Sequence, residues 1–573
     1  MKTHDDIHRR RATLAARFPA WRPTTLGDWL DDCARRYSER PFVITDDITM
    51  SYRDVAERSR RLAAGLSALG VRRGDRVGLL MANYPEFVTL KFAIARLGAI
   101  AVPFNYLYRS DELRFVLADS GCRVLITMTR FGQQDYQRML DEIVPGWDRD
   151  PFPSRPGSAA GAVGELRHVV LRETDGEPPR PGRMTVTELE ATGDTAALAA
   201  AAGDIDPQAA ADLLYTSGTT GFPKGVVTSH DAVLRTAYAS ALTRAFEDGR
   251  RILFSLPCYH MFGYIEGLLS VMFVGGAIIP QPTFSPEGYF AGIARHRATD
   301  VLCVPTMAVA MAESAHREDH DLDSLRAMLC GSAPAPVWLW RQIERDFGIS
   351  EIVTGYGMTE CGGAMTLTLP EDPLELTSET VGRPKLAGAA GVDETGALTV
   401  YRTVDPGSGR ELDAGTTGEL VSRGPTTMLG YWNRPAETAE ALRGGWLHSG
   451  DLGRIRDDGY LEITGRSKEL YKSGGELVMP KEIEDLLAGY DDISQVFAVG
   501  LTDERWGEIG CVVVVPAPGA RLTEQEVLDR CRARLARFKV PKRVEFLQAA
   551  ELPTTPTGKV QKFRLVERFT RRG

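Results

Sequence analysis

Residues 215–225 read Tyr215-Thr-Ser-Gly-Thr-Thr-Gly-Phe-Pro-Lys-Gly225 and combine hydroxyl side chains, glycines and one lysine. Glycine lets backbone N–H groups face phosphate oxygens without interference from a Cβ atom, and Lys224 adds a positive charge. The segment therefore predicts a phosphate-binding loop. It differs from the usual mononucleotide loop, because Pro223 precedes the lysine and Gly225, rather than Ser or Thr, follows it. The hydroxyl that usually binds Mg²⁺ is thus missing from this segment.

A second glycine-rich segment, Gly355-Tyr-Gly-Met-Thr-Glu360, lies far from the first along the chain. A hard cation on phosphate needs oxygen ligands and often takes only one or two carboxylates from the protein. The pair Thr359 and Glu360 can supply such oxygens. Together the two segments predict ATP chemistry on a carboxylate.

Helix and strand patterns alternate in the N-terminal part of the chain. Val55, Leu62, Leu66 and Leu69 form one helix face that Gly70 ends, and residues 77–81 read as a buried strand. The pattern repeats with a helix before residue 98, an apolar stretch at 99–102, a helix near 112–118 and a strand at 124–126. Such a series predicts parallel sheets covered by helices.

The phosphate-binding segment follows a predicted strand at 211–215 and precedes a helix that begins near Ser229, so we expect a strand–loop–helix junction. Past residue 465, Thr523-Glu-Gln-Glu526 forms a capping box for a helix between strands at 511–515 and 543–546, which predicts a small α+β domain. Residues 145–164, where Pro, Gly, Ser and Ala dominate, predict an exposed loop, and residues 196–202 are also expected at the surface.

Size and composition limit the class of protein. A chain of 573 residues, 43% of them hydrophobic, predicts at least two domains. The net charge of -9 argues against a nucleic-acid partner, and Arg9-Arg10-Arg11 is expected in a solvated tail. The eight cysteines lie singly, which argues against zinc sites and disulfides. No apolar stretch reaches the ~18 residues of a membrane span and no signal core is evident, so a cytoplasmic location is expected.

In their order and separation, the two glycine-rich segments resemble the adenylate-forming superfamily, which includes acyl-CoA and aryl-CoA synthetases, luciferases and peptide-synthetase adenylation domains. The resemblance covers the chain from residue 25 onward and continues through Gly418-Glu-Leu420, Gly430-Tyr-Trp432, His448-Ser-Gly-Asp451, Gly465-Arg466-Ser-Lys468, Ser473-Gly-Gly-Glu476, Pro480-Lys-Glu-Ile-Glu484 and Pro556-Thr-Gly-Lys559. It implies an α/β fold with a large N-terminal domain, residues 1–466, made of two βα layers and a small barrel. A hinge would join this domain to a small mobile α+β domain, residues 467–573.

The resemblance also implies a reaction. An organic acid, either aryl or medium-chain, would attack the α-phosphate of ATP in the presence of Mg²⁺, giving an acyl-adenylate and pyrophosphate, and CoA would then give a thioester and AMP. Lys559 would bridge the carboxylate and the α-phosphate, since fixed positive charge has to screen the two anions. Glu360 would hold Mg²⁺ and Thr359 would contact the α-phosphate. His260 would border the acid's carboxylate, although a satisfied core histidine remains an alternative.

The remaining site residues are assigned by the same resemblance. Phosphate contacts are expected from Thr216, Ser217, Gly218, Thr219, Thr220, Gly221 and Lys224, adenine contacts from Gly331, Ser332, Ala333, Pro334, Gly355, Tyr356 and Gly357, and ribose contacts from Asp451 and Arg466. Lys468 matches the hinge, and Ser473, Gly474 and Gly475 match the CoA side. The acid pocket is expected to be walled by Tyr259, Phe262, Tyr264, Cys361, Gly362, Gly363 and Met365, with Cys361 as a small buried side chain rather than a nucleophile.

Several alternatives stay open at this point. The acceptor could be a carrier-protein thiol or an amine instead of CoA, and an oxyanion such as nitrite could be adenylated for nitrogen–nitrogen bond formation on an aryl amine. A non-catalytic nucleotide-binding relative is a further alternative, which the presence of both Lys559 and Glu360 disfavours. Whether the protein is a monomer or a homodimer is left open by the sequence.

Overall fold

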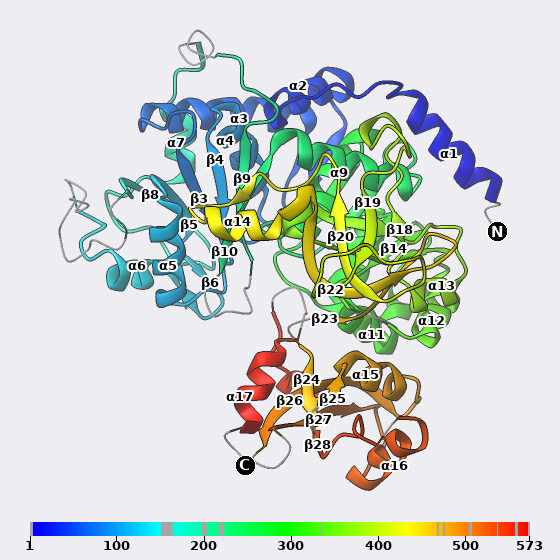
Figure 1. Cartoon of the computed structure of the whole chain (residues 1–573). Helices are drawn as coiled ribbons and strands as arrows, with labels where there is room; N and C mark the ends of the chain where they lie inside the picture. The colour runs from blue at the N-terminus through cyan, green and yellow to red at the C-terminus, as the bar shows by residue number, and fades with distance from the viewer. Residues whose placement is uncertain are drawn as a thin grey trace.

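The computed structural model describes residues 4–149, 163, 165–196, 203–216, 223–333, 335–466, 469–473, 476–503, 507–535, 537–555 and 560–570. Figure 1 shows a large domain that reaches to strand β23 (Leu461–Arg466) and a smaller domain that begins with β24 (Tyr471–Ser473). The predicted α/β class, with a large N-terminal and a small C-terminal domain, is confirmed. The boundary at residue 466 stays a prediction, because residues 467–468 lie outside the described parts.

A seven-stranded sheet forms the first half of the large domain, in the order β21-β10-β9-β4-β3-β5-β8. Its strands are β3 (Arg76–Leu80), β4 (Ile100–Pro103), β5 (Val124–Met128), β8 (His168–Arg172), β9 (Ala210–Thr216), β10 (Lys224–Ser229) and β21 (Gly430–Tyr431). Strands β9, β4, β3, β5 and β8 run parallel to one another. Strand β10 is antiparallel to β9, and β21 is antiparallel to β10. The parallel strands predicted from the N-terminal pattern are therefore confirmed.

Helices beside this sheet are α2 (Leu26–Tyr37), α3 (Tyr52–Ala68), α4 (Pro85–Arg96), α5 (Ser110–Ser120), α6 (Tyr136–Ile143) and α7 (Val186–Thr192). The predicted helix that Gly70 ends is α3, which starts at a capping box formed by Ser51 and Asp54. Two short strands, β6 (Arg130–Phe131) and β7 (Gln134–Asp135), form a hairpin before α6.

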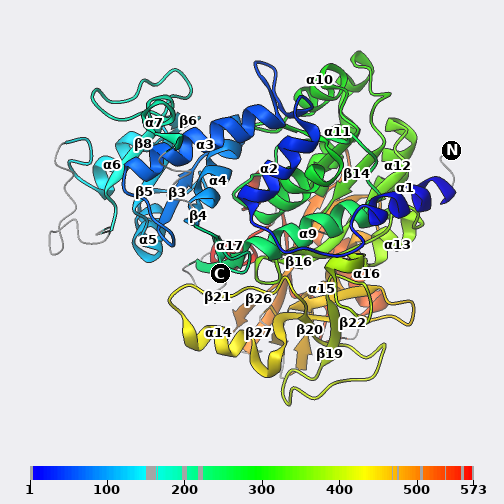
Figure 2. The same ribbon diagram turned by 90° about the horizontal axis from the view of Figure 1, so that it is seen from above.

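A second seven-stranded sheet forms the other half, in the order β15-β14-β13-β11-β12-β1-β2. Its strands are β1 (Pro41–Ile44), β2 (Thr49–Ser51), β11 (Arg251–Phe254), β12 (Ala277–Pro280), β13 (Asp300–Cys303), β14 (Ala327–Cys330) and β15 (Glu351–Val353). The helices of this half are α1 (His4–Ala16), α9 (His230–Thr243), the π-helix η2 (Phe262–Leu269), η3 (Ser270–Val274), α10 (Pro286–His296), α11 (Pro305–Glu313), η4 (Ala315–Asp319), α12 (Val337–Phe347) and α13 (Leu374–Glu379). Seen from above in Figure 2, α9 lies at the centre of the large domain, between the helices of the two halves.

Two smaller antiparallel sheets complete the large domain. One contains β16 (Gly355–Met358), β17 (Gly363–Leu367) and β18 (Arg383–Pro384), and the other contains β19 (Val400–Val404), β20 (Gly418–Arg423), β22 (Leu447–Ile455) and β23. The segments between strands in this region contain the short helices η5 (Thr359–Cys361), η6 (Gly388–Ala390), α14 (Pro435–Ala441) and η7 (Arg443–Gly445).

The small domain folds around one five-stranded sheet. Its elements are β24, β25 (Glu476–Val478), α15 (Pro480–Ala488), β26 (Ile493–Asp503), β27 (Gly507–Pro516), α16 (Glu524–Arg534), β28 (Arg543–Phe546), η8 (Ala549–Glu551) and α17 (Lys562–Thr570). The predicted capping box is present, with Thr523 and Glu526 at the start of α16. Two apolar clusters, separate from the core of the large domain, pack on this sheet. In the described parts of the chain, no helix has both the length and the apolar character of a membrane span.

Two local expectations need correction. The phosphate-binding segment is followed by strand β10, which pairs antiparallel with β9, and α9 begins only at residue 230 with Ser229 as its cap. The segment thus lies at the turn of a β-hairpin, because the residues after Lys224 pair with β9 before the helix starts. The predicted exposed loop at 145–164 also contains buried side chains: Trp147 donates a hydrogen bond to Asp141 at 3.0 Å, and Val163 is buried, while residues 150–162 and 164 lie outside the described parts.

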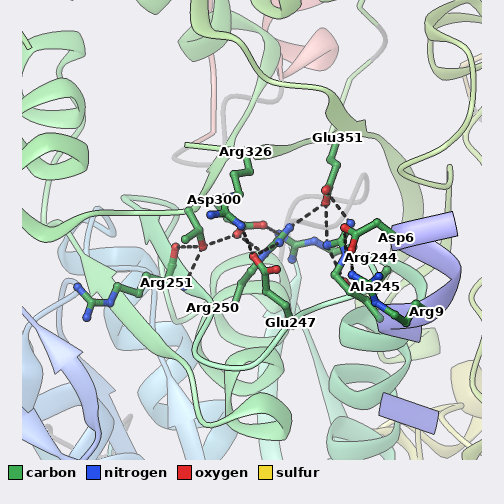
Figure 3. A network of polar contacts seen from close by, with 12 residues as sticks. Asp6, Arg9, Arg244, Ala245, Glu247, Arg250, Arg251, Asp300, Arg326 and Glu351 are labelled. Atoms are coloured by element: carbon green, nitrogen blue, oxygen red, sulfur yellow. Dashed lines mark hydrogen bonds and ion pairs between the residues drawn. The ribbon is translucent and has the colours of Figure 1, made fainter. Parts of the chain in front are cut away.

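The prediction that Arg9-Arg10-Arg11 form a solvated tail is correct for Arg9, which is exposed, and wrong for Arg10 and Arg11, which pair with distant carboxylates. Figure 3 shows the network of buried ion pairs that α1 joins. Arg10 on α1 is buried and pairs with Glu351 at 2.7 Å, and Arg11 pairs with Glu371 at the same distance. Glu351 also pairs with Arg250 at 3.0 Å, which in turn pairs with Asp300 at 2.6 Å. The N-terminal helix is therefore fixed by charge pairing at Arg10 together with the burial of Ile7 and Leu14.

We expect Asp300→Asn to lower the free energy of unfolding by about 3–5 kcal/mol, because the change removes the buried carboxylate that two buried guanidinium groups share. Asp300 is 0% exposed and pairs with both Arg244 and Arg250. Urea denaturation followed by circular dichroism measures the change. The control is Asp321→Asn, which breaks an exposed pair with Arg297 and should cost less than about 1 kcal/mol. Equal costs for the two variants would contradict this view of the network.

Candidate active site

The β9–β10 hairpin brings the two ends of the phosphate-binding segment together. Thr216 and Lys224 are cross-strand partners, and the Thr216 hydroxyl donates a hydrogen bond to the Lys224 carbonyl at 3.4 Å. Residues 217–222, between them, lie outside the described parts of the chain. The hairpin therefore fixes the two ends of the predicted phosphate-binding segment, Thr216 and Lys224, opposite each other.

Two residues beyond the predicted set hold Lys224. Its ammonium pairs with the Glu437 carboxylate on α14 and lies 5.1 Å from the centre of the Tyr431 ring. This pairing with Lys224 is the main reason why the pKa of Glu437 lies below its usual value. The lysine that the sequence assigns to phosphate binding is thus paired with a carboxylate of the protein, Glu437.

Tyr431 also contacts the predicted metal ligand. Its hydroxyl donates a hydrogen bond to Glu360 Oε1 at 2.9 Å, and the Met428 N–H donates to the Glu360 carbonyl at 2.8 Å. Burial, and next the charge of Glu360, raise the pKa of Tyr431, so the phenol stays a donor. Glu360 and Thr359 are each only 9% exposed. Tyr431 therefore contacts both the predicted metal ligand, Glu360, and the lysine predicted to bind phosphate, Lys224.

The oxygen atoms of Glu360 and Thr359 suit Mg²⁺, which prefers hard oxygen ligands. Among the described residues, no group of three His, Cys, Asp or Glu side chains could enclose a metal ion. This donor set fits an ion held by one protein carboxylate together with phosphate oxygens and water, as is usual for Mg²⁺ on nucleotides.

The second glycine-rich segment forms the β16–β17 hairpin. A Cβ atom at Gly357 would lie 1.9 Å from the Gly363 carbonyl oxygen, and one at Gly355 would lie 2.3 Å from the Thr366 carbonyl oxygen, so both positions require glycine. Between them, the Tyr356 hydroxyl donates a hydrogen bond to Asp451 Oδ2 at 2.5 Å. The predicted adenine and ribose residues are thus in direct contact.

Contacts on neighbouring strands hold the two residues predicted to bind ribose. Asp451 on β22 and Arg466 on β23 are cross-strand partners, which places the two predicted ribose residues opposite each other, although the Arg466 side chain is not described. Glu419, which the sequence assigned no role, accepts hydrogen bonds from the Gly450 N–H at 3.0 Å and contacts His448 Nδ1 at 2.9 Å. Glu419 therefore fixes the turn that carries Asp451.

The predicted second wall of the adenine site lies near η2. A Cβ atom at Gly331 would lie 3.5 Å from the Phe262 ring and 4.0 Å from the Gly355 carbonyl oxygen. Ser332 has a left-handed backbone, with φ of 76°, and it and Ala333 are exposed. The structure thus brings Gly331, Phe262 and Gly355 together.

His260 precedes η2 and is oriented by the backbone. Its Nδ1 accepts a hydrogen bond from the Phe262 N–H at 3.2 Å, so the neutral imidazole carries its proton on Nε2. A proton on Nε2 can be donated to a carboxylate oxygen. This geometry is consistent with the predicted position beside the acid, and the role itself stays a prediction.

The two pocket glycines face α9 and η2. Gly362 and Gly363 have φ of 94° and 110°, a region that glycine adopts easily. A side chain at Gly363 would meet Met261, Ile265 and Thr236 at 3.5, 3.7 and 3.9 Å. These three residues therefore join the predicted pocket wall, which already contains the buried Met365.

Three predicted pocket residues have informative surroundings. Burial raises the pKa of Cys361 to about 12, so it is a neutral thiol, as the sequence suggested. The Tyr259 hydroxyl is buried without a partner among the described residues, and its ring packs edge-on against Tyr106. Tyr264 is fully buried, and its hydroxyl donates to Asp212 at 3.1 Å. This contact directs the Tyr264 hydroxyl to Asp212, and the assignment of Tyr264 to the pocket wall stays a prediction.

Part of the predicted site lies outside the described residues: Ser217, Gly218, Thr219, Thr220, Gly221, Pro334, Lys468, Gly474, Gly475 and Lys559. Their roles stay predictions. Ser473 is described and is buried on β24, opposite Glu476 of β25. Tyr431 and Glu437 were missed, although Tyr431 belongs to the Gly430-Tyr-Trp432 motif quoted above without a role.

Residues 30–432 match the family described as "AMP-binding enzyme", and residues 482–559 match its "AMP-binding enzyme C-terminal domain". A feruloyl-CoA synthase from Amycolatopsis sp is 35% identical over 95% of this chain and 99% of its own. A 3-[(3aS,4S,7aS)-7a-methyl-1,5-dioxo-octahydro-1H-inden-4-yl]propanoyl:CoA ligase from Mycobacterium tuberculosis is 34% identical over 94% of this chain and 97% of its own.

A solved structure is similar as well. The anthranilate CoA ligase AuaEII in complex with anthranoyl-AMP superimposes with a TM-score of 0.80 and 26% sequence identity, covering 95% of this chain and 97% of the other. All of these likenesses span both domains.

We expect Glu437→Gln to tighten the binding of ATP by about two- to five-fold, since Lys224 would no longer be neutralised by a half-exposed carboxylate. The Kd of a non-hydrolysable ATP analogue, measured by titration calorimetry, tests this. Glu440→Gln removes an exposed charge from the same helix and should leave the Kd within two-fold of the wild type. Weaker binding in Glu437→Gln would mean that Glu437 positions Lys224 rather than competing for it.

Proposed function

The chain belongs to the AMP-binding enzyme family, and we propose that it is an AMP-forming ligase that activates a carboxylic acid as its adenylate and transfers the acyl group to CoA. The proposal is supported by relatives named as CoA ligases over nearly the whole chain. The observation that carries it is the contact of Tyr431 with both Glu360 and Lys224. This contact joins the predicted metal carboxylate to the phosphate-binding lysine.

In the first step, the carboxylate of the acid attacks the α-phosphate and pyrophosphate leaves. Lys224 and the β9–β10 loop bind the leaving phosphates, and Asp451 with Tyr356 holds the ribose end, so that the reacting atoms stay in line. Mg²⁺, held by Glu360, would neutralise phosphate charge when bound. His260 orients the acid through its Nε2 proton, and Lys559 bridges the two anions.

In the second step, the thiol of CoA attacks the acyl carbon and AMP leaves. We propose that the small domain turns about Lys468 between the two steps. This turn would move Lys559 away from the reacting atoms and bring Ser473, Gly474 and Gly475 to them. A single site would then serve two reactions in sequence, as in other enzymes that gate their active sites by domain movement. The buried position of Ser473 on β24 gives that surface a rigid base.

The proposed reaction is tested by measuring pyrophosphate release with a panel of acids, with and without CoA. Ferulate, anthranilate and octanoate represent the aryl and medium-chain classes that the relatives and the pocket residues suggest. We expect release with at least one acid, and conversion to a thioester when CoA is present. Release without a thioester would support a carrier thiol or an amine as acceptor, and release with nitrite alone would support the oxyanion alternative. If none of these releases pyrophosphate, the enzyme assignment is wrong.

Lys559→Ala should keep ATP binding and lower the adenylation rate at least ~100-fold, because the bridging charge acts mainly in the transition state. Pyrophosphate exchange under saturating ATP measures the rate, and titration calorimetry checks the binding. Lys542→Ala, on the same domain, serves as control and should leave the rate unchanged. An unaltered rate in Lys559→Ala would refute the role.

Lys468→Pro should spare adenylate formation and block thioester formation, since proline fixes one backbone angle of the hinge. Single-turnover experiments that follow adenylate and thioester separately distinguish the two steps. Equal loss of both steps would contradict a hinge at this position.

A further inference from the structure

Three fully buried polar side chains contact one another beside the predicted acid pocket. They are Ser240, Glu266 and Lys385, called here the polar triad. Lys385 Nζ lies 2.6 Å from Glu266 Oε1, and it also donates a hydrogen bond to the Ser240 hydroxyl. Ser240 donates in turn to Glu266 Oε2 at 2.6 Å. Their exposed fractions are 0%, 1% and 0% for Ser240, Glu266 and Lys385. Such a cluster is costly to bury, which calls for a function or a strong structural reason.

The triad stands on the same elements as the pocket wall. On α9, Ser240 follows Thr236 by one helical turn, so the two side chains share a face. On η2, Glu266 directly follows Ile265, and Thr236 and Ile265 both approach Gly363. The triad therefore lies next to the side chains that approach Gly363.

Lys385 is tied to the same wall from the other side. Its backbone N–H donates to the Met365 carbonyl on β17 at 2.9 Å, and Met365 is a predicted wall residue. The Lys385 ammonium is also close enough to act on the neighbouring Cys361: burial raises the pKa of this thiol to about 12, and the positive charge partly opposes that rise. Three elements thus place the triad next to Cys361, Gly363 and Met365.

The Lys385 ammonium can donate one further hydrogen bond. An ammonium has three N–H donors, and within the described part of the chain Lys385 has two acceptors, Ser240 and Glu266. A buried charged donor without an acceptor is more costly than a neutral one, so an acceptor from a ligand is favoured here. The Glu266 carboxylate, with about four lone-pair positions, can also accept a further hydrogen bond.

Helix η2 adds a second indication. It is a π-helix over eight residues, and π-helical turns are rare and frequent at functional sites. The wider turn places Ile265 toward Gly363 while Glu266 reaches Lys385. The distorted helix therefore carries a wall residue and a triad residue side by side.

On the basis of the proposed function, we propose that Lys385 and Glu266 form the polar end of the acid pocket and select an aryl acid that carries a hydroxyl group remote from its carboxylate. A hydroxyl group can accept from Lys385 and donate to Glu266 at once, which matches the capacity left in the triad. A long alkyl chain would instead have to bury methylene groups against two charges. Sites built to hydrogen-bond a substrate hydroxyl reject analogues that lack it.

The test compares 4-hydroxycinnamate with cinnamate, two acids that differ by one hydroxyl group, with octanoate as the alkyl reference. In the wild type, kcat/KM for pyrophosphate release should favour 4-hydroxycinnamate over cinnamate at least ~10-fold, mainly through KM. In the double variant Lys385→Met/Glu266→Leu, which removes both charges together, the ratio should fall to about one. Lys385→Met alone should show the same loss if it folds.

The matched control removes another buried ion pair of the large domain. Lys91 and Asp212 pair at 2.5 Å and are as buried as the triad, but they lie beside Tyr264 in the core. The variant Lys91→Met/Asp212→Leu should therefore change stability without changing the ratio between the two acids. A ratio that falls equally in both double variants would show a general effect of destabilisation and overturn the proposal.

A binding measurement separates failure of the proposal from failure of the proposed reaction. The 4-hydroxycinnamoyl and cinnamoyl sulfamoyl adenosines imitate the adenylates without reacting. Their Kd values should differ at least ~10-fold in the wild type and should be about equal in Lys385→Met/Glu266→Leu. Discrimination without pyrophosphate release from any acid would support the polar pocket and refute the ligase reaction. Release of pyrophosphate with equal Kd values, or a preference for octanoate, would refute the polar pocket alone.

Discussion

Charge that is removed from water has to find a partner, and this requirement governs the interior of the large domain. The ion pairs run from Arg10 through Glu351, Arg250 and Asp300 to Arg244, whose guanidinium also donates to the Glu266 carbonyl at 3.2 Å. Because Glu266 pairs with Lys385, the network reaches from α1 to the polar triad, next to the residues predicted to line the acid pocket. The same chain of charges thus connects the second sheet to that region.

The side of the site that the sequence assigns to phosphate is more open. Lys224 and Glu437 are only partly buried and stand on β10 and α14, whereas Glu360 is 9% exposed. Tyr431 contacts both Lys224 and Glu360, and Glu437 pairs with Lys224. If Lys224 binds phosphate as the sequence predicts, a bound nucleotide would replace Glu437 as its partner.

Sequence reasoning succeeded where the signal is local. The helix face from Val55 to Leu69 and the capping box at Thr523 correspond to α3 and α16, because periodicity and caps depend on neighbouring residues. The long glycine-rich motifs identified the family, since a motif preserves a loop geometry such as the close approach at Gly357.

It failed where partners come from distant segments. No local pattern shows that Arg10 meets Glu351, that Tyr264 turns to Asp212, or that Glu437 holds Lys224. The residues after Lys224 were assigned to a loop before a helix, because the strand partner that makes them β10 is β9, across a turn. Candidate roles for Lys559 and Lys468 rest on the motif alone, as both lie outside the described residues.

The ion pair between Arg10 and Glu351 spans 341 positions of the chain, which matters for how the protein is made. At synthesis rates of roughly 5–20 residues per second, the ribosome needs on the order of 20–70 s to deliver the carboxylate after the arginine has emerged. During that interval Arg10 has only its partner within the helix, Asp6, because Glu351 has not yet been synthesised. The contact that ties α1 to β15 can therefore form only after most of the large domain has been made.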